Sequence, residues 1–175
     1  MKRFRLLLLL SCSIFILALF SSCTDQSEET LGKLSEDFRE AAVTCAEQLE
    51  HGENYRAVSA AEDGTSVTFR LDESLWQHIT VDEFTLTWDL RKGAVSSVEI
   101  CGLGETATDV AATNDWLLLL RSVIPEKDAP KALIQIEMSN FLSGVLEEKL
   151  YCDGKYSLQY EETKDRCCFT GRLMK

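Results

Sequence analysis

The chain has 175 residues, of which 45% are hydrophobic and 27% charged, and its formal net charge is −11. This composition is typical of a folded domain and excludes collagen-like, low-complexity and disordered chains. The first 22 residues contain three basic residues and no acid, so the remainder carries a net charge of −14. Because such an acidic surface repels phosphate backbones, we expect no nucleic acid among the partners.

The amino-terminal segment has the three parts of a secretory signal peptide. Met1 to Arg5 is basic, Leu6 to Phe20 is a largely apolar run of about 15 residues, and two serines precede Cys23. A helix needs about 20 apolar residues to span a bilayer, so this run is short for the alternative, a retained transmembrane anchor. Residues 1–22 are therefore predicted to be a signal peptide.

The end of this segment, Leu19-Phe20-Ser21-Ser22-Cys23, resembles a bacterial lipobox, with Phe20 where the family usually has Leu, Val or Ile. The resemblance implies that cleavage leaves Cys23 as a new amino terminus carrying two or three fatty acyl chains, which hold a protein stably on a membrane. The resemblance thus implies a lipoprotein on the extracytoplasmic face of the cell membrane. Residues 23–32 form the acylated cysteine and an acidic tether, and residues 33–175 form one domain.

The first predicted element of the domain is a helix within Lys33–Glu50, because apolar residues recur there at spacings of three and four. The apolar stripe consists of Leu34, Phe38, Ala41, Ala42, Cys45 and Leu49. Ser35 is the expected N-cap, and Gly52 is the expected stop.

Two β-hairpins are predicted next, because apolar and polar residues alternate. The first joins Tyr55–Ala61 to Ser66–Asp72 through the turn pair Asp63-Gly64. The second joins Glu83–Leu90 to Ala94–Cys101. In the second hairpin the expected apolar face of the first strand consists of Phe84, Leu86, Trp88 and Leu90.

The rest of the chain predicts two central helices and a last hairpin. The helices lie within Asp109–Ile124 and Asp128–Leu150, and the hairpin joins Lys155–Glu161 to Cys167–Leu173. Pro125 ends the first of these helices. Separate stretches of helix and antiparallel strand predict an α+β fold, with the N-terminal helix and the two central helices packed on one face of the sheet.

Five cysteines remain once Cys12 has left with the signal peptide and Cys23 has been acylated. They are Cys45, Cys101, Cys152, Cys167 and Cys168. An odd number leaves at least one thiol unpaired, and the sequence leaves open whether the others are reduced, form one or two disulfides, or serve metal or redox chemistry. No C-x-x-C pair occurs, and His51 and His78 are the only histidines, which gives little support to a zinc site.

Other candidate features have simpler structural interpretations. Gly102 to Ala107 matches a dinucleotide-binding pattern, but the strand before it belongs to a hairpin rather than to a parallel βαβ unit. Asp72-Glu73 and Asp82-Glu83 could hold a cation, although they lack calcium-loop spacing and fit a solvated acidic loop. Between them, Trp76 is either an exposed contact residue or a cover for the sheet edge, and His78 is a loop residue rather than a base.

These observations favour a non-catalytic domain that binds a ligand or an envelope protein, with Trp76 and His78 as candidate binding residues. No catalytic set converges in the sequence, and we expect no cofactor and no metal. The alternatives are a cell-envelope enzyme with a carboxylate- or thiol-based site, and a structural subunit of an envelope complex whose hairpin edges dock on a partner.

Overall fold

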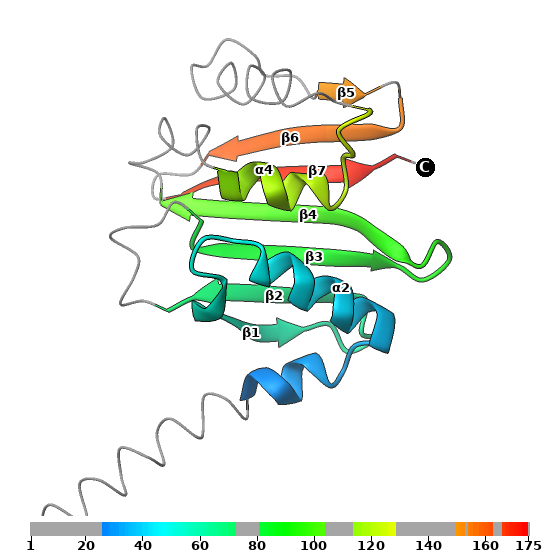
Figure 1. Ribbon diagram of the computed structural model, residues 1–175. Coiled ribbons are helices and arrows are strands. Elements are labelled where there is room, and N and C mark those ends of the chain that lie inside the picture. The colour runs from blue at the N-terminus through cyan, green and yellow to red at the C-terminus, as the bar shows by residue number, and fades with distance from the viewer. Residues whose placement is uncertain are drawn as a thin grey trace, which may run out of the picture.

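The computed structural model describes residues 26–72, 81–103, 114–128, 150–152, 154–162 and 166–174. The described strands are β1 (Tyr55–Ala60), β2 (Ser66–Leu71), β3 (Glu83–Asp89), β4 (Ala94–Leu103), β5 (Leu150–Cys152), β6 (Tyr156–Glu162) and β7 (Arg166–Leu173). They form one antiparallel sheet in the order β1-β2-β3-β4-β7-β6-β5 (Figure 1). The described helices are α2 (Glu36–Glu47), α4 (Asn114–Arg121), the short 3₁₀ helix η1 (Gly52–Asn54) and a helical segment at residues 26–31. The predicted α+β class is confirmed.

The strand order divides the sheet into an amino-terminal half, β1 to β4, and a carboxy-terminal half, β5 to β7. The predicted hairpins are present as β1–β2, β3–β4 and β6–β7, and β2 also pairs with β3. The pairing of β4 with β7 joins the amino-terminal half to the carboxy-terminal half. The short strand β5 overlaps the end of the helix predicted over Asp128–Leu150. Asp128 lies in a turn, and residues 129–149 lie outside the described residues.

Helix α2 begins as predicted but ends earlier. The Ser35 side chain accepts a hydrogen bond from the Phe38 backbone N–H, as an N-cap does. The expected stop at Gly52 is wrong, because α2 ends at Glu47 and the residue with a left-handed backbone is His51, at φ 64°. Gly52 serves a close approach instead, since a Cβ there would lie 2.4 Å from the Ala46 carbonyl oxygen.

The two faces of the sheet differ in character because side chains alternate along each strand. We call one the apolar face; it includes the buried residues Val67, Phe69, Leu71, Phe84, Leu86, Trp88, Val98, Ile100 and Phe169. Phe38 of α2 stacks on Trp88 with ring centroids 5.1 Å apart, and Trp116 of α4 meets Phe169 edge-on at 5.2 Å. Leu90 does not join this face as predicted, because it lies in the turn after β3 and is 68% exposed.

Residues 26–31, which the sequence places in the tether, are helical and pack on the domain. Ser27 Oγ accepts a hydrogen bond from the Ala57 backbone N–H of β1, and Glu28 pairs with Arg39 of α2 at 2.7 Å. Leu31 is buried in the hydrophobic core. The folded part therefore includes Gln26, three positions after Cys23. Among the described residues, no helix is both long and apolar enough to cross a membrane.

A buried carboxylate joins α4 to the turn after α2. Asp115 Oδ1 accepts a hydrogen bond from the Glu50 backbone N–H at 3.0 Å. Burial raises the pKa of Asp115 above its ordinary value of 3.8, and the Glu50 N–H opposes this shift. Because the folded state then holds this proton more tightly than the unfolded state, the contribution of Asp115 to stability falls as the pH rises from about 3.8.

Asp115→Asn is therefore expected to gain stability relative to the wild type as the pH rises through this window. Asparagine keeps an acceptor for the Glu50 N–H and never becomes charged, so the two proteins should differ least below pH 3.8. Urea unfolding between pH 3 and 8 measures the difference. Asp63→Asn is the matched control with the opposite trend, because hydrogen bonds from Thr65 lower the pKa of Asp63. A constant difference for Asp115→Asn across this range would contradict the argument.

Candidate functional site

The one disulfide among the described residues joins Cys101 of β4 to Cys168 of β7. The two residues are direct partners in the strand register, with Cα atoms 4.2 Å apart and an S–S distance of 2.13 Å. Facing side chains of antiparallel strands come close enough for such a bond without a loop to bring them together. The disulfide thus crosses the junction between the two halves of the sheet.

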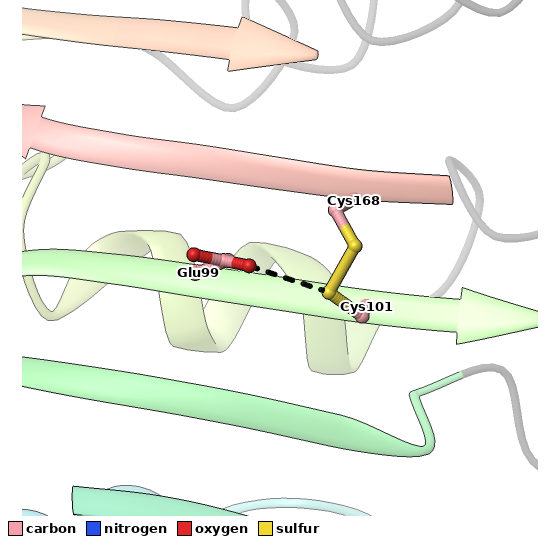
Figure 2. A group of neighbouring side chains, drawn as sticks. All are labelled: Glu99, Cys101 and Cys168. Carbon is pink, nitrogen blue, oxygen red and sulfur yellow. Dashed lines mark hydrogen bonds between the residues drawn. A yellow bond between two sulfur atoms is a disulfide. The ribbon is translucent and has the colours of Figure 1, made fainter. Parts of the chain in front are cut away.

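Glu99 lies two residues before Cys101 and points to the same side of β4 (Figure 2). Its Oε1 atom is 3.8 Å from Cys101 Sγ. A disulfide sulfur carries no hydrogen, so this contact becomes a hydrogen bond only when Cys101 is a thiol. Cys101 is buried, Cys168 is half-buried and Glu99 is exposed, so solvent reaches the cluster from the Glu99 side.

The cluster lies on the sheet face opposite the apolar face, which we call the polar face. Its residues on the central strands include Thr68, Arg70, Glu83, Thr85, Thr87, Ser97, Glu99, Cys101, Cys168, Thr170 and Arg172. Across this face one row of directly paired residues runs Arg70, Glu83, Cys101, Cys168 and Glu161. The disulfide therefore lies in a charged row, with a carboxylate on the neighbouring strand at either side.

The acids expected in a solvated loop at Asp82-Glu83 are held by arginines instead. Asp82 is buried, and its two carboxylate oxygens lie 3.0 and 3.1 Å from one Arg166 nitrogen. Glu83 pairs with Arg70 at 2.6 Å and with Arg166 at 3.7 Å. Burial raises the pKa of Asp82, and Arg166 opposes the shift. These pairs occupy the carboxylates, so Asp82 and Glu83 do not form an open cation site.

Several residues singled out from the sequence lie outside the described part of the chain. They are Cys23, Trp76 and His78, together with Glu73 and the 104–107 part of the glycine-rich segment. Gly102 lies within β4, whose neighbours β3 and β7 are both antiparallel to it. A parallel strand on either side, which dinucleotide binding requires, is therefore absent at this position.

The structure assigns a state to three of the cysteines whose state the sequence left open. Cys101 and Cys168 are oxidised together, and Cys45 on α2 is a free, half-buried thiol whose pKa is raised by burial. The structure does not describe the side chains of Cys152 and Cys167. Sequence reasoning did not single out Glu99, although alternation alone places it on the same face as Cys101.

A shallow pocket of about 380 Å³ lies where residues 26–31 meet α2 and β1. Leu31, Val43 and Phe69 line it with apolar surface, and Glu28, Glu53 and Arg56 add charged groups. Tyr55 also lines the pocket, and its hydroxyl donates a buried hydrogen bond to the Val81 carbonyl at 2.6 Å. This pocket is one place in the described part of the chain where a small, partly apolar molecule could bind.

Comparison with known proteins gives no relative from which a function could be transferred: no family model, no curated protein and no solved structure matches the chain.

Proposed function

We propose that this protein is a lipoprotein, anchored through acylated Cys23 to the extracytoplasmic face of the cell membrane, whose α+β domain binds a protein or a small ligand without catalysis. The observation that carries the proposal is the Cys101–Cys168 disulfide. Structural disulfides persist in exported proteins and are rare in the reducing cytosol. The disulfide therefore supports the export that the lipobox-like segment implies.

In this proposal the domain sits close to the membrane. Because Ser27 and Glu28 already contact β1 and α2, Thr24 and Asp25 alone separate the acylated cysteine from the first described helical residue. Two residues span about 7 Å when fully extended. The β1 side of the sheet, with the pocket beside residues 26–31, would then face the headgroups.

We further propose that the helices cover one face of the sheet and leave the polar face for binding. Phe38 of α2 and Trp116 of α4 both contact aromatic rings of the apolar face, which supports a common side for the two helices. The polar face offers hydroxyl, carboxylate and guanidinium groups over several strands. Such groups suit a hydrogen-bonding partner better than an apolar one.

A thiol-based enzyme is the second candidate, because a disulfide beside the Glu99 carboxylate could exchange with an external thiol. The two candidates differ in turnover. A binding protein should not accelerate reduction of an added low-molecular-weight disulfide by a dithiol, whereas a thiol oxidoreductase should do so catalytically.

Cys23→Ala tests the anchor. We expect the variant to lose the acyl mass increment and to leave the membrane fraction or remain as uncleaved precursor, because no acyl chain can be attached. Intact-mass spectrometry and fractionation of cells expressing each protein measure both effects. Ser22→Ala, which keeps a small residue before the cysteine, is the matched control and should behave as the wild type. A Cys23→Ala protein that is cleaved normally and stays firmly membrane-bound would overturn the lipoprotein assignment.

A further inference from the structure

We propose that reduction of the Cys101–Cys168 disulfide creates a site for a thiophilic divalent cation of the zinc class, bound by the two cysteine thiolates and the Glu99 carboxylate. The site is redox-controlled, because the cation binds the reduced pair and is released when the disulfide forms. This inference goes beyond the anchoring and binding roles proposed above and does not depend on them.

The strand register brings the three ligands together. The sulfur atoms of Cys101 and Cys168 and a carboxylate oxygen of Glu99 all lie within 4.8 Å of one another. Around a tetrahedral zinc ion, with Zn–S bonds of about 2.3 Å, two thiolate sulfurs lie about 3.8 Å apart. Reduction releases the sulfurs from their 2.13 Å bond, and rotation of the cysteine side chains can supply this separation while β4 and β7 remain paired.

The charges around the reduced pair favour a cation. Two thiolates would add two negative charges beside the Glu99 carboxylate, on a chain whose net charge is already −11. Arg70 in the row, and Arg166 two residues before Cys168 on β7, are engaged with Glu83 and Asp82. A divalent cation at the three ligands balances the two added charges. Without the cation, the thiols would have to stay protonated to avoid these charges.

The kinds of ligand determine the kind of metal. Thiolates select zinc and its soft analogues, such as cadmium, over magnesium and calcium, which prefer oxygen ligands. Three protein ligands leave a fourth position for water or another group. Glu161 is the next carboxylate in the row, directly opposite Cys168 on β6, and its described partner is the Gln159 side-chain amide at 3.2 Å.

Reduction of the disulfide and binding of the cation are two separate steps. First, an external dithiol transfers two electrons and two protons to the protein disulfide, which breaks the S–S bond, gives two protein thiols and leaves the external reagent as a disulfide. Second, the cation displaces the two thiol protons and binds both sulfurs. In the oxidised protein neither sulfur can become a thiolate, so Glu99 alone remains as an anionic ligand.

The test titrates the full chain in detergent with Cd²⁺ alone, before and after anaerobic reduction with a phosphine. We expect the reduced wild type to bind one cadmium at this site, seen as a cadmium–thiolate charge-transfer band, which the oxidised protein lacks. Cys101→Ser/Cys168→Ser should lose this band, whereas the matched Cys152→Ser/Cys167→Ser variant should keep it. Glu99→Gln should keep the band but raise the Kd by at least about tenfold.

Circular dichroism of every sample checks that the chain is folded, and Zn²⁺ supplies a second measurement. Binding to the folded state should raise the midpoint of thermal unfolding of the reduced wild type and leave that of the Cys101→Ser/Cys168→Ser variant unchanged. The proposal is overturned if the reduced wild type binds no cadmium, if it unfolds on reduction, or if removal of both cysteines leaves the affinity unchanged.

Discussion

Phe84→Ala is expected to lower the free energy of unfolding by about 3–5 kcal/mol, the range for deleting a large aromatic side chain from a packed core. Phe84 is 1% exposed and lies on β3, near the middle of the amino-terminal half of the sheet. Its ring stacks on Phe69 at a centroid distance of 5.0 Å and contacts the Tyr55 ring at 5.5 Å. Removing it leaves a cavity between three strands, which the hydrogen-bonded ladders prevent from collapsing.

Denaturant unfolding monitored by circular dichroism measures this loss, and Leu90→Ala is the matched control. Both residues belong to the predicted alternation Phe84, Leu86, Trp88 and Leu90, but Leu90 is largely exposed in the turn. Its replacement should change the free energy of unfolding by less than about 0.5 kcal/mol. Equal losses for the two variants would mean that Leu90 packs as the sequence pattern suggests.

The elements that sequence reasoning predicted well are those determined by neighbouring residues. Alternation from Val67 to Leu71 and from Phe84 to Trp88 predicted the buried face, because a strand repeats its side-chain direction every two residues. The turn at Asp63-Gly64 was predicted correctly for the same local reason: Gly64 has φ 67°, and the Asp63 carboxylate accepts the Thr65 backbone N–H. The Ser35 cap is likewise a property of one turn of chain.

The errors occur where the structure depends on contacts that the local sequence pattern does not specify. Gly52 matched the pattern of a helix stop, but its small size is required by the Ala46 carbonyl against which the chain folds back. Asp82 and Glu83 resembled solvated acids, because nothing in the sequence shows that Arg166, 84 positions after Asp82, lies beside them. The pairing of Cys101 with Cys168, rather than with any other cysteine, follows from the β4–β7 register, which no hairpin signal specifies.

The Cys101–Cys168 disulfide is the basis of the second large expected change in stability. Cys101→Ser/Cys168→Ser is expected to lower the free energy of unfolding by about 2–4 kcal/mol. The disulfide links positions 67 residues apart, and the loop-entropy relation gives about 4 kcal/mol for a loop of this length. Most of the effect arises in the unfolded chain, because the cross-link keeps the two halves of the sheet near each other before β4 and β7 pair.

Equilibrium denaturation in the presence of a chelator measures this loss without a contribution from bound metal. Cys45→Ala is the matched control, because Cys45 is a free, half-buried thiol, and its replacement should cost less than about 1 kcal/mol. A reductant should lower the stability of the wild type by the same amount as the double substitution and should leave the double variant unchanged. If the double variant is as stable as the wild type, the unfolded chain already keeps its two halves together, and the disulfide then adds no stability to the sheet.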